Sequence, residues 1–161
     1  MNELTVTTPS DREIVMTRDF NAPRPLVFDA YTKPELLKRW LLGPPGWTMP
    51  ICEIDLRVDG RYRYVWRNSD GTEMGMGGVF REIVHPERIV CTQLFDEDWT
   101  GGEALGTAIF TERDGGKTRL TNTMVYSSRE ARDACLKTGM EQGMAASFDS
   151  LDMLLASGIS S

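Results

Sequence analysis

Apolar and polar residues alternate along most of the stretch from Met49 to Tyr126. A period of two residues is typical of strands with one buried face. Turn signals rich in Gly, Pro and Asp divide the stretch, and connections this short join antiparallel neighbours. With an earlier strand near 13–20, the pattern predicts about seven strands, the later six lying near 52–58, 62–66, 74–84, 88–96, 103–113 and 117–126.

The turn at Asp59-Gly60 decides which face of two strands is buried. A two-residue loop would point the arginines of the following strand toward the core. A three-residue loop with Gly60 in the left-handed conformation avoids this. We therefore expect the longer loop, in which four side chains share the buried face: Leu56, Tyr62, Tyr64 and Trp66.

Two short helices are expected between the first and second strands. Pro23 and Pro25 suit the first turn of a helix that continues to Tyr31. The run Thr32-Lys33-Pro34-Glu35 matches a capping box, which predicts that a second helix starts there. The run Gly43-Pro44-Pro45-Gly46 is expected to end it.

A long helix is expected after Tyr126, capped near Ser127-Ser128, broken near Thr138-Gly139 and stopped at Gly158. Its apolar stripe consists of Met140, Met144, Phe148, Leu151 and Leu155. A sheet with one wet face needs cover on the other, and only this helix is long enough. The sequence thus predicts an α+β fold in which a curved antiparallel sheet wraps around the C-terminal helix. Residues 1–11 are expected to form a flexible N-terminus, 12–157 a single domain and 158–161 a tail.

Composition limits the function classes. The chain has 161 residues with 40% hydrophobic content, enough for one continuous core. Its 18 basic and 24 acidic residues give a net charge of -6, which disfavours nucleic acid as a partner. Three unpaired cysteines indicate a reducing compartment. The first ten residues lack a secretory signal and no apolar run spans a bilayer, so a cytoplasmic location is expected.

No catalytic constellation is evident. His85 is the only histidine, and it precedes a proline in a turn, which suits neither a general base nor an imidazole-rich metal site. No G-x-S-x-G elbow and no phosphate-binding glycine loop occur. We therefore expect no catalytic residue, no metal and no cofactor.

Several motifs resemble the START/SRPBCC (Bet v-like, helix-grip) superfamily. They are Phe20-x-Ala-Pro-Arg-x-Leu-Val-Phe-x-Ala, Thr32-x-Pro-Glu-x-Leu, Trp40-x-x-Gly-Pro, Gly78-Val-Phe-Arg-Glu-Ile and Gly139-Met-x-x-Gly-Met. Within the superfamily, residues 12–157 are similar to bacterial proteins related to the C-terminal domain of the heat-shock ATPase activator (AHSA-like). The resemblance implies an elongated cavity between the sheet and the long helix. Members bind lipids, sterols, polyketides or plant hormones, and a minority catalyse cyclisation or hydrolysis.

A pocket and a filled core are both open from the sequence, because aromatic rows and methionines serve either. The leading hypothesis is binding of a small hydrophobic or amphipathic molecule that is lipid-, polyketide- or flavonoid-like. The alternatives are a cyclase- or hydrolase-like enzyme and a chaperone-associated interaction module, and a homodimer is also open. The predicted cavity lining is Trp40, Trp47, Leu56, Tyr62, Tyr64, Trp66, Met76, Gln93, Phe95, Asn122, Met124, Met140, Met144 and Phe148.

Overall fold

A computed structural model of the protein describes residues 3–97 and 102–158, and within these the chain forms eight strands and four helices. The strands are β1 Thr5–Thr7, β2 Glu13–Phe20, β3 Trp47–Ile54, β4 Arg61–Asn68, β5 Glu73–Val84, β6 Arg88–Phe95, β7 Ala104–Arg113 and β8 Lys117–Val125. The helices are α1 Arg24–Thr32, α2 Pro34–Leu37, α3 Arg129–Lys137 and α4 Met140–Ala156. The turn expected at 99–102 lies, except for Gly102, outside the described residues.

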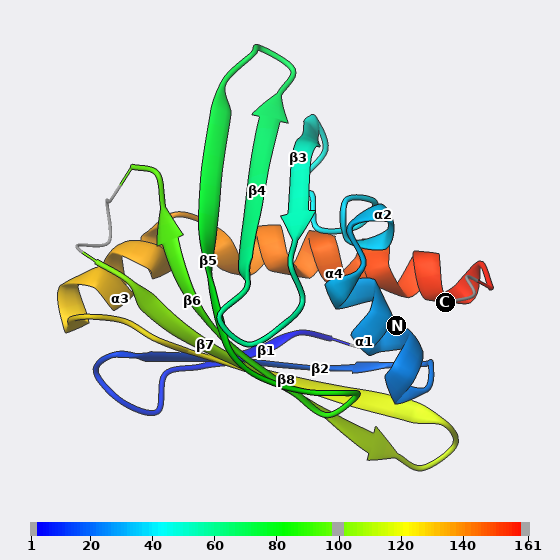
Figure 1. The fold of residues 1–161 in the computed structure, drawn as a ribbon. Coiled ribbons are helices and arrows are strands. Elements are labelled where there is room, and N and C mark those ends of the chain that lie inside the picture. Colours follow the sequence, from blue (N-terminus) through cyan, green and yellow to red (C-terminus); the bar gives the residue numbers. More distant parts are fainter. Residues whose placement is uncertain (1–2, 98–101, 159–161) are drawn as a thin grey trace.

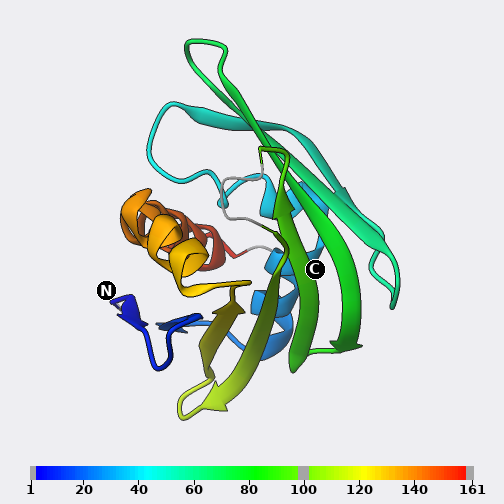
Figure 2. The same cartoon turned by 90° about the vertical axis from the view of Figure 1, so that its left-hand side faces the viewer.

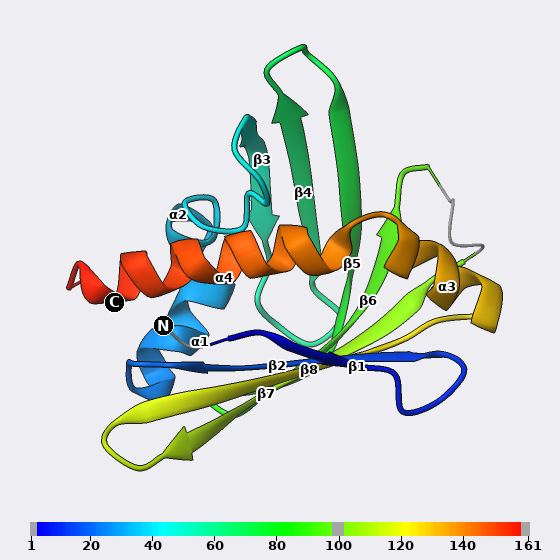
Figure 3. The same cartoon turned by 180° about the vertical axis from the view of Figure 1, so that it is seen from behind.

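All strands join one antiparallel sheet in the order β1-β2-β8-β7-β6-β5-β4-β3. The sheet curves strongly, and α4 crosses its concave side (Figures 1 and 2). Seen from behind, α3 and α4 follow one another along this side, while α1 and α2 pack at the C-terminal end of α4 (Figure 3). This arrangement confirms the predicted α+β, helix-grip fold. Among the described residues, no helix is long and apolar enough to cross a membrane.

The N-terminus corrects the predicted strand number. Thr5–Thr7, expected to be flexible, form β1, which pairs with β2 in the register Val6 to Met16. A strand of three residues is too short to show alternation in the sequence. Its pairing partner is the edge of β2 that β8 leaves free, so pairing with the next strand in the chain forms β1.

The turn before β4 also differs from the prediction. β3 ends at Ile54, so Leu56 lies in the turn and is 40% exposed. Asp59, not Gly60, takes the left-handed conformation, with a φ of 68°. The Asp59 amide donates to the Phe80 carbonyl at 2.8 Å, so the turn docks on β5 and leaves the β3 ladder. The face of β4 was correctly predicted, because Tyr62 is opposite Ile54 on β3 and lines the concave side.

The helix boundaries show one error and one success. The capping box at the start of α2 is wrong, because the Thr32 hydroxyl donates to the Phe28 carbonyl within α1 at 2.9 Å. The predicted break in the last helix is confirmed, since Gly139 separates α3 from α4 with a φ of 79°. Ser128 caps α3, its hydroxyl accepting a hydrogen bond from the Ala131 amide at 3.0 Å.

Helix α4 packs on the core with its C-terminal half. Phe148, Leu151 and Leu155 are buried, and the Phe148 ring lies edge-on to Phe20 at 5.6 Å between centroids. Met144, nearer the start of the helix, is only half-buried. Thus the first turns of α4 lie over space that the core does not fill.

A buried arginine ties α4 to the sheet. Arg18 on β2 is 2% exposed, and its two terminal nitrogens lie 2.8 Å from an Asp149 oxygen and 2.5 Å from an Asp152 oxygen. Both acids are on α4, and the guanidinium also lies 5.5 Å from the centre of the Phe20 ring. These two ion pairs fix the helix over β2.

Candidate ligand-binding cavity

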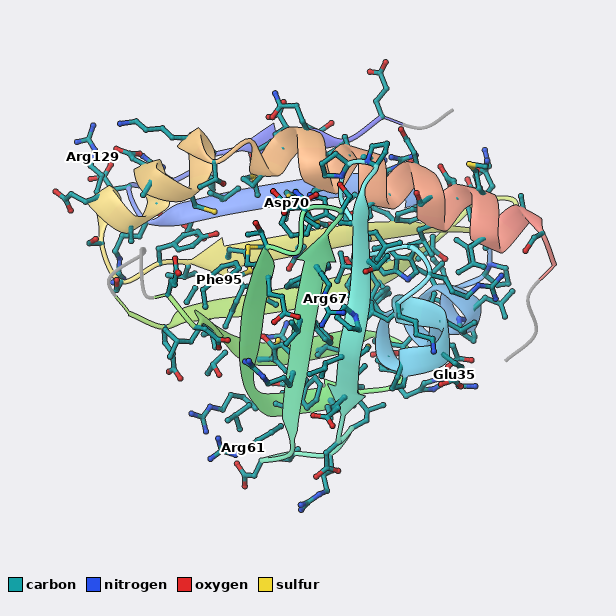
Figure 4. All side chains as sticks on the ribbon, turned by 90° about the horizontal axis from the view of Figure 1, so that it is seen from above. Glu35, Arg61, Arg67, Asp70, Phe95 and Arg129 are labelled. Atoms are coloured by element: carbon teal, nitrogen blue, oxygen red, sulfur yellow. The ribbon has the colours of Figure 1, made fainter. Side chains whose placement is uncertain are left out.

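A cavity of about 730 Å³ lies between the sheet and the first turns of α4. Its walls come from β2, β4–β8, α1, the α3–α4 joint and the segment 41–47 (Figure 4, in which Phe95 marks β6 and Arg67 marks β4). Many of the lining side chains are aromatic residues or methionines: Met16, Tyr31, Trp47, Tyr62, Tyr64, Trp66, Met74, Met76, Phe80, Phe95, Met124, Tyr126, Met140 and Met144.

Small residues on β7 leave this space open. Gly106 and Ala108 line the cavity, whereas Leu105 and Ile109, which flank this pair along the strand, are exposed on the outer face. Ala108 is level with Asn122 on β8, and Gly106 is level with Met124. Larger inward side chains on β7 would fill the middle of the cavity, so the alternation of small inward and large outward residues creates it.

Two aromatic side chains on β4 are held by hydrogen bonds. The Tyr62 hydroxyl donates to the Thr92 carbonyl at 2.5 Å, and the Trp66 indole donates to the Leu41 carbonyl at 2.7 Å. Gly78 makes room for the first of these, because a Cβ atom there would lie 2.9 Å from the Tyr62 ring. These hydrogen bonds anchor the side chains of Tyr62 and Trp66 in the β4 wall.

The hydroxyls of Tyr31 and Tyr64 and the side-chain amides of Gln93 and Asn122, all on buried or half-buried residues of the lining, have no such bond with any of the described residues. Burial raises the pKa of both phenols, so they stay protonated and can donate. Buried polar groups normally find partners, and here a ligand or water in the cavity can supply them.

Exposed lining residues mark the mouth of the cavity. They are Pro44 in the segment after α2, Met74 on β5, and Thr138, Gly139 and Gln142 at the α3–α4 joint. The amide of Gly43 donates to the Ser147 hydroxyl on α4 at 2.8 Å, which holds one rim in place. The mouth thus lies between a proline-rich segment, a strand end and the helix joint.

The structure brings together most of the residues predicted to line a cavity. Trp47, Tyr62, Tyr64, Trp66, Met76, Gln93, Phe95, Asn122, Met124, Met140 and Met144 all do so. Trp40 does not, because its indole donates to the Ala30 carbonyl at 2.9 Å inside the core. Phe148 stacks on Trp40, and Leu56 lies in the exposed turn after β3.

Several residues that line the cavity were not predicted from the sequence. Tyr31 comes from α1, where the sequence pattern places it on the apolar side with Leu26, Val27 and Ala30 but does not assign it to the cavity. Cys91 and Ile89 are two and four residues before Gln93 on the same strand face, so the period of two would have found them. Gly106 and Ala108 carry no chemical signal, because their contribution is the space they leave.

The described part of the cavity lining contains few ionisable side chains. In the described ranges no group of three His, Cys, Asp or Glu side chains lies close enough to hold a metal ion. The ionisable side chains at the described cavity surface are tyrosines and the thiols of Cys91 and Cys135, and burial raises the pKa of both thiols. A protonated thiol is a poor nucleophile.

Alkylation kinetics check these thiols. Burial raises the pKa of Cys52 to about 11, and it also raises the pKa of Cys91 and Cys135. Because only the thiolate reacts, iodoacetamide should modify the folded protein at about pH 8 at least ~100-fold more slowly than the unfolded chain. The rate for Cys52 should rise about tenfold per pH unit up to its pKa. Rapid alkylation of Cys91, followed by mass spectrometry, would contradict the burial described above.

Two tyrosine variants separate structural from binding roles. Tyr62→Phe removes the donor to the buried Thr92 carbonyl, so the free energy of unfolding should fall by about 1–2 kcal/mol. Tyr64→Phe removes a hydroxyl that has no partner among the described residues, so stability should stay within about 0.5 kcal/mol. Urea denaturation of the two variants measures this difference. Equal losses would show that the Tyr64 hydroxyl has a structural partner.

Comparisons with known proteins place the chain in a family. Residues 21–156 match the family model for activator of Hsp90 ATPase homolog 1-like protein, and the chain belongs to this family. A crystal structure of a protein from Rhodobacter sphaeroides is 32% identical, with a TM-score of 0.90 over 96% of this chain and 99% of that one. Another, from Mycobacterium smegmatis, is 28% identical, with a TM-score of 0.82 over 94% and 96% of the chains.

A more distant structural relative has a named activity. The crystal structure of an HSP90 activator from Plasmodium falciparum is 21% identical, with a TM-score of 0.64 over 90% of this chain and 96% of that one. Identity at this level shows a shared fold. A search of curated proteins finds no match for the chain.

Proposed function

We propose that this protein binds a small hydrophobic or amphipathic molecule in the cavity between the sheet and α4. The observation that carries the proposal is a cavity of about 730 Å³ with an apolar wall and four unpartnered polar side chains. Ligand sites in proteins are typically concave, mostly apolar and supplied with a few polar groups that fix orientation. The methionines add an adaptable surface, because their side chains are flexible and polarisable.

Simple energetics support useful affinity. A ligand that buries roughly 300 Å² of apolar surface gains about 7.5 kcal/mol at ~25 cal/mol per Å². Association and ordering costs reduce this gain, while hydrogen bonds to the polar side chains add to it. A dissociation constant in the micromolar range is therefore expected. We further propose a reducing compartment such as the cytoplasm, since Cys52, Cys91 and Cys135 are free thiols.

Fluorescence titration tests the proposed function. N-phenyl-1-naphthylamine is uncharged and becomes fluorescent in apolar surroundings, so its signal should rise to saturation at one molecule per chain. Unlabelled neutral hydrophobic compounds should displace it. A probe signal that grows without saturation, or that no competitor reduces, would contradict a defined cavity site.

A second candidate function is a chaperone-associated role, which the family description and the named Plasmodium falciparum relative favour. In that case the chain should stimulate the ATPase activity of an Hsp90-type chaperone. A coupled ATPase assay with and without the protein measures this. The two candidates are separable, because a cavity-blocking substitution would abolish probe binding and leave ATPase stimulation intact.

A further inference from the structure

We propose that the cavity selects uncharged ligands that carry hydroxyl or carbonyl groups, and that it excludes anions such as carboxylates and sulfonates. This inference rests on the proposed binding function and narrows it to a chemical class. It follows from the charges along the wall, the hydrogen-bonding groups in the wall and the electrostatics of the mouth.

The first observation is the absence of charge on the cavity wall. Within residues 3–97 and 102–158, no Asp, Glu, Lys, Arg or His side chain lines the cavity. The residues outside these ranges include no Lys, Arg or His either. An ionised ligand group would thus move from water into a cavity that offers it no counter-ion. Burying an unpaired charge costs several kcal/mol.

Two arginines on the surrounding strands, Arg18 and Arg63, form ion pairs with carboxylates of the protein. Arg18, the one buried arginine on β2, is held by Asp149 and Asp152. On β4, Arg63 forms two hydrogen bonds with Asp96 at 2.7 and 2.6 Å, away from the cavity. These ion pairs leave the arginines next to the wall engaged with carboxylates of the protein itself.

The mouth does not favour anions. Helix α4 begins there, and a helix N-terminus carries a partial positive charge. Glu141 lies in the first turn of α4 and opposes that charge. The chain as a whole carries a net charge of -6, which repels anions at long range.

The polar groups in the wall suit a neutral oxygen. Tyr31 and Tyr64 offer hydroxyls, while Gln93 and Asn122 each offer both an amide donor and a carbonyl acceptor. A ligand hydroxyl can donate and accept at such a site, and a ligand carbonyl can accept from a phenol or an amide. A purely hydrocarbon ligand would leave these groups unsatisfied.

Two matched pairs of probes test the selection. N-phenyl-1-naphthylamine and 8-anilino-1-naphthalenesulfonate share one ring skeleton, and the second adds a sulfonate. We expect the sulfonate to bind at least about 100-fold more weakly. When these compounds compete with N-phenyl-1-naphthylamine, the affinity of 1-naphthalenemethanol should likewise be at least about 100-fold higher than that of 1-naphthoate. Affinities within about threefold across both pairs would overturn the proposal and leave the binding function standing.

Failure of the function has a different signature. If neither N-phenyl-1-naphthylamine nor 1-naphthalenemethanol binds, the cavity is not a ligand site, and both the proposed function and this inference are wrong. Binding of the neutral members alone supports both. The four titrations on the wild-type protein therefore separate the two failures.

A charge placed in the wall should reverse the preference. Gln93→Lys puts a cation in the cavity, and we expect the affinity for 1-naphthoate to rise at least about tenfold. Leu94→Lys is the matched control. Leu94 follows Gln93 on β6 and is exposed on the outer face, and this substitution changes the net charge by the same amount. An equal gain in both variants would attribute the effect to net charge and contradict selection by the wall.

Discussion

The double variant Asp149→Asn, Asp152→Asn is expected to lose about 3–5 kcal/mol of its free energy of unfolding. Arg18 is almost fully buried, and these two acids supply its ion pairs. Without them a guanidinium would remain in the interior with only neutral acceptors and the Phe20 ring beside it. Urea denaturation followed by circular dichroism measures the loss.

Removing the arginine as well is the informative control. In the triple variant with Arg18→Met, no charge remains buried, and an apolar side chain of similar length fills the site. Such replacements are often neutral or stabilising, so most of the lost stability should return. If the triple variant is as unstable as the double variant, the cost comes from the helix surface and the ion pairs contribute little.

The second large effect is expected from blocking the cavity. Ala108→Trp places an indole in the middle of the space, beside Asn122 and Ile89. Affinity for N-phenyl-1-naphthylamine should fall at least about 100-fold, which is ~2.7 kcal/mol. Stability should change by less than about 1 kcal/mol, because the new side chain enters empty space and displaces no packed group.

Ile109→Trp is the matched control for this experiment. It adds the same side chain one residue further along β7, where Ile109 is exposed on the outer face. Probe affinity should stay within about twofold of the wild type. If Ala108→Trp binds the probe as well as Ile109→Trp does, the probe site lies elsewhere on the protein.

Alternation along the chain predicted the fold well, because strand periodicity is a local property. The inward face of β4 followed from it, as did Gln93, Asn122 and Met124 in the wall. The prediction that Leu56 lines the cavity was wrong for a non-local reason. The Asp59 amide donates a hydrogen bond to the Phe80 carbonyl on β5, so the turn lies against β5 and Leu56 is not paired in the β3–β4 ladder. The prediction that Trp40 lines the cavity was wrong because its indole donates a hydrogen bond to the Ala30 carbonyl in the core.

The existence of the cavity was harder to predict than its lining. An aromatic row facing a methionine stripe fits both a filled core and a pocket. The deciding feature is missing volume at Gly106 and Ala108, and it has meaning only once their neighbours across the sheet are known. The ion pairs of Arg18 were equally difficult to predict from the sequence, because Asp149 and Asp152 lie more than 130 positions away on the last helix.

The central claim is that a small molecule binds inside this cavity, and methionine-methyl NMR tests it most directly. Of the methionines that the structure describes, two lie outside the wall, the core residue Met49 and the 71% exposed Met153, and they serve as internal controls. The cavity methionines are Met16, Met74, Met76, Met124, Met140 and Met144. On titration with N-phenyl-1-naphthylamine, methyl signals of the cavity methionines should shift together to saturation, while those of Met49 and Met153 stay in place. Shifts confined to Met153, or none at the cavity methionines under saturating probe, would contradict the account.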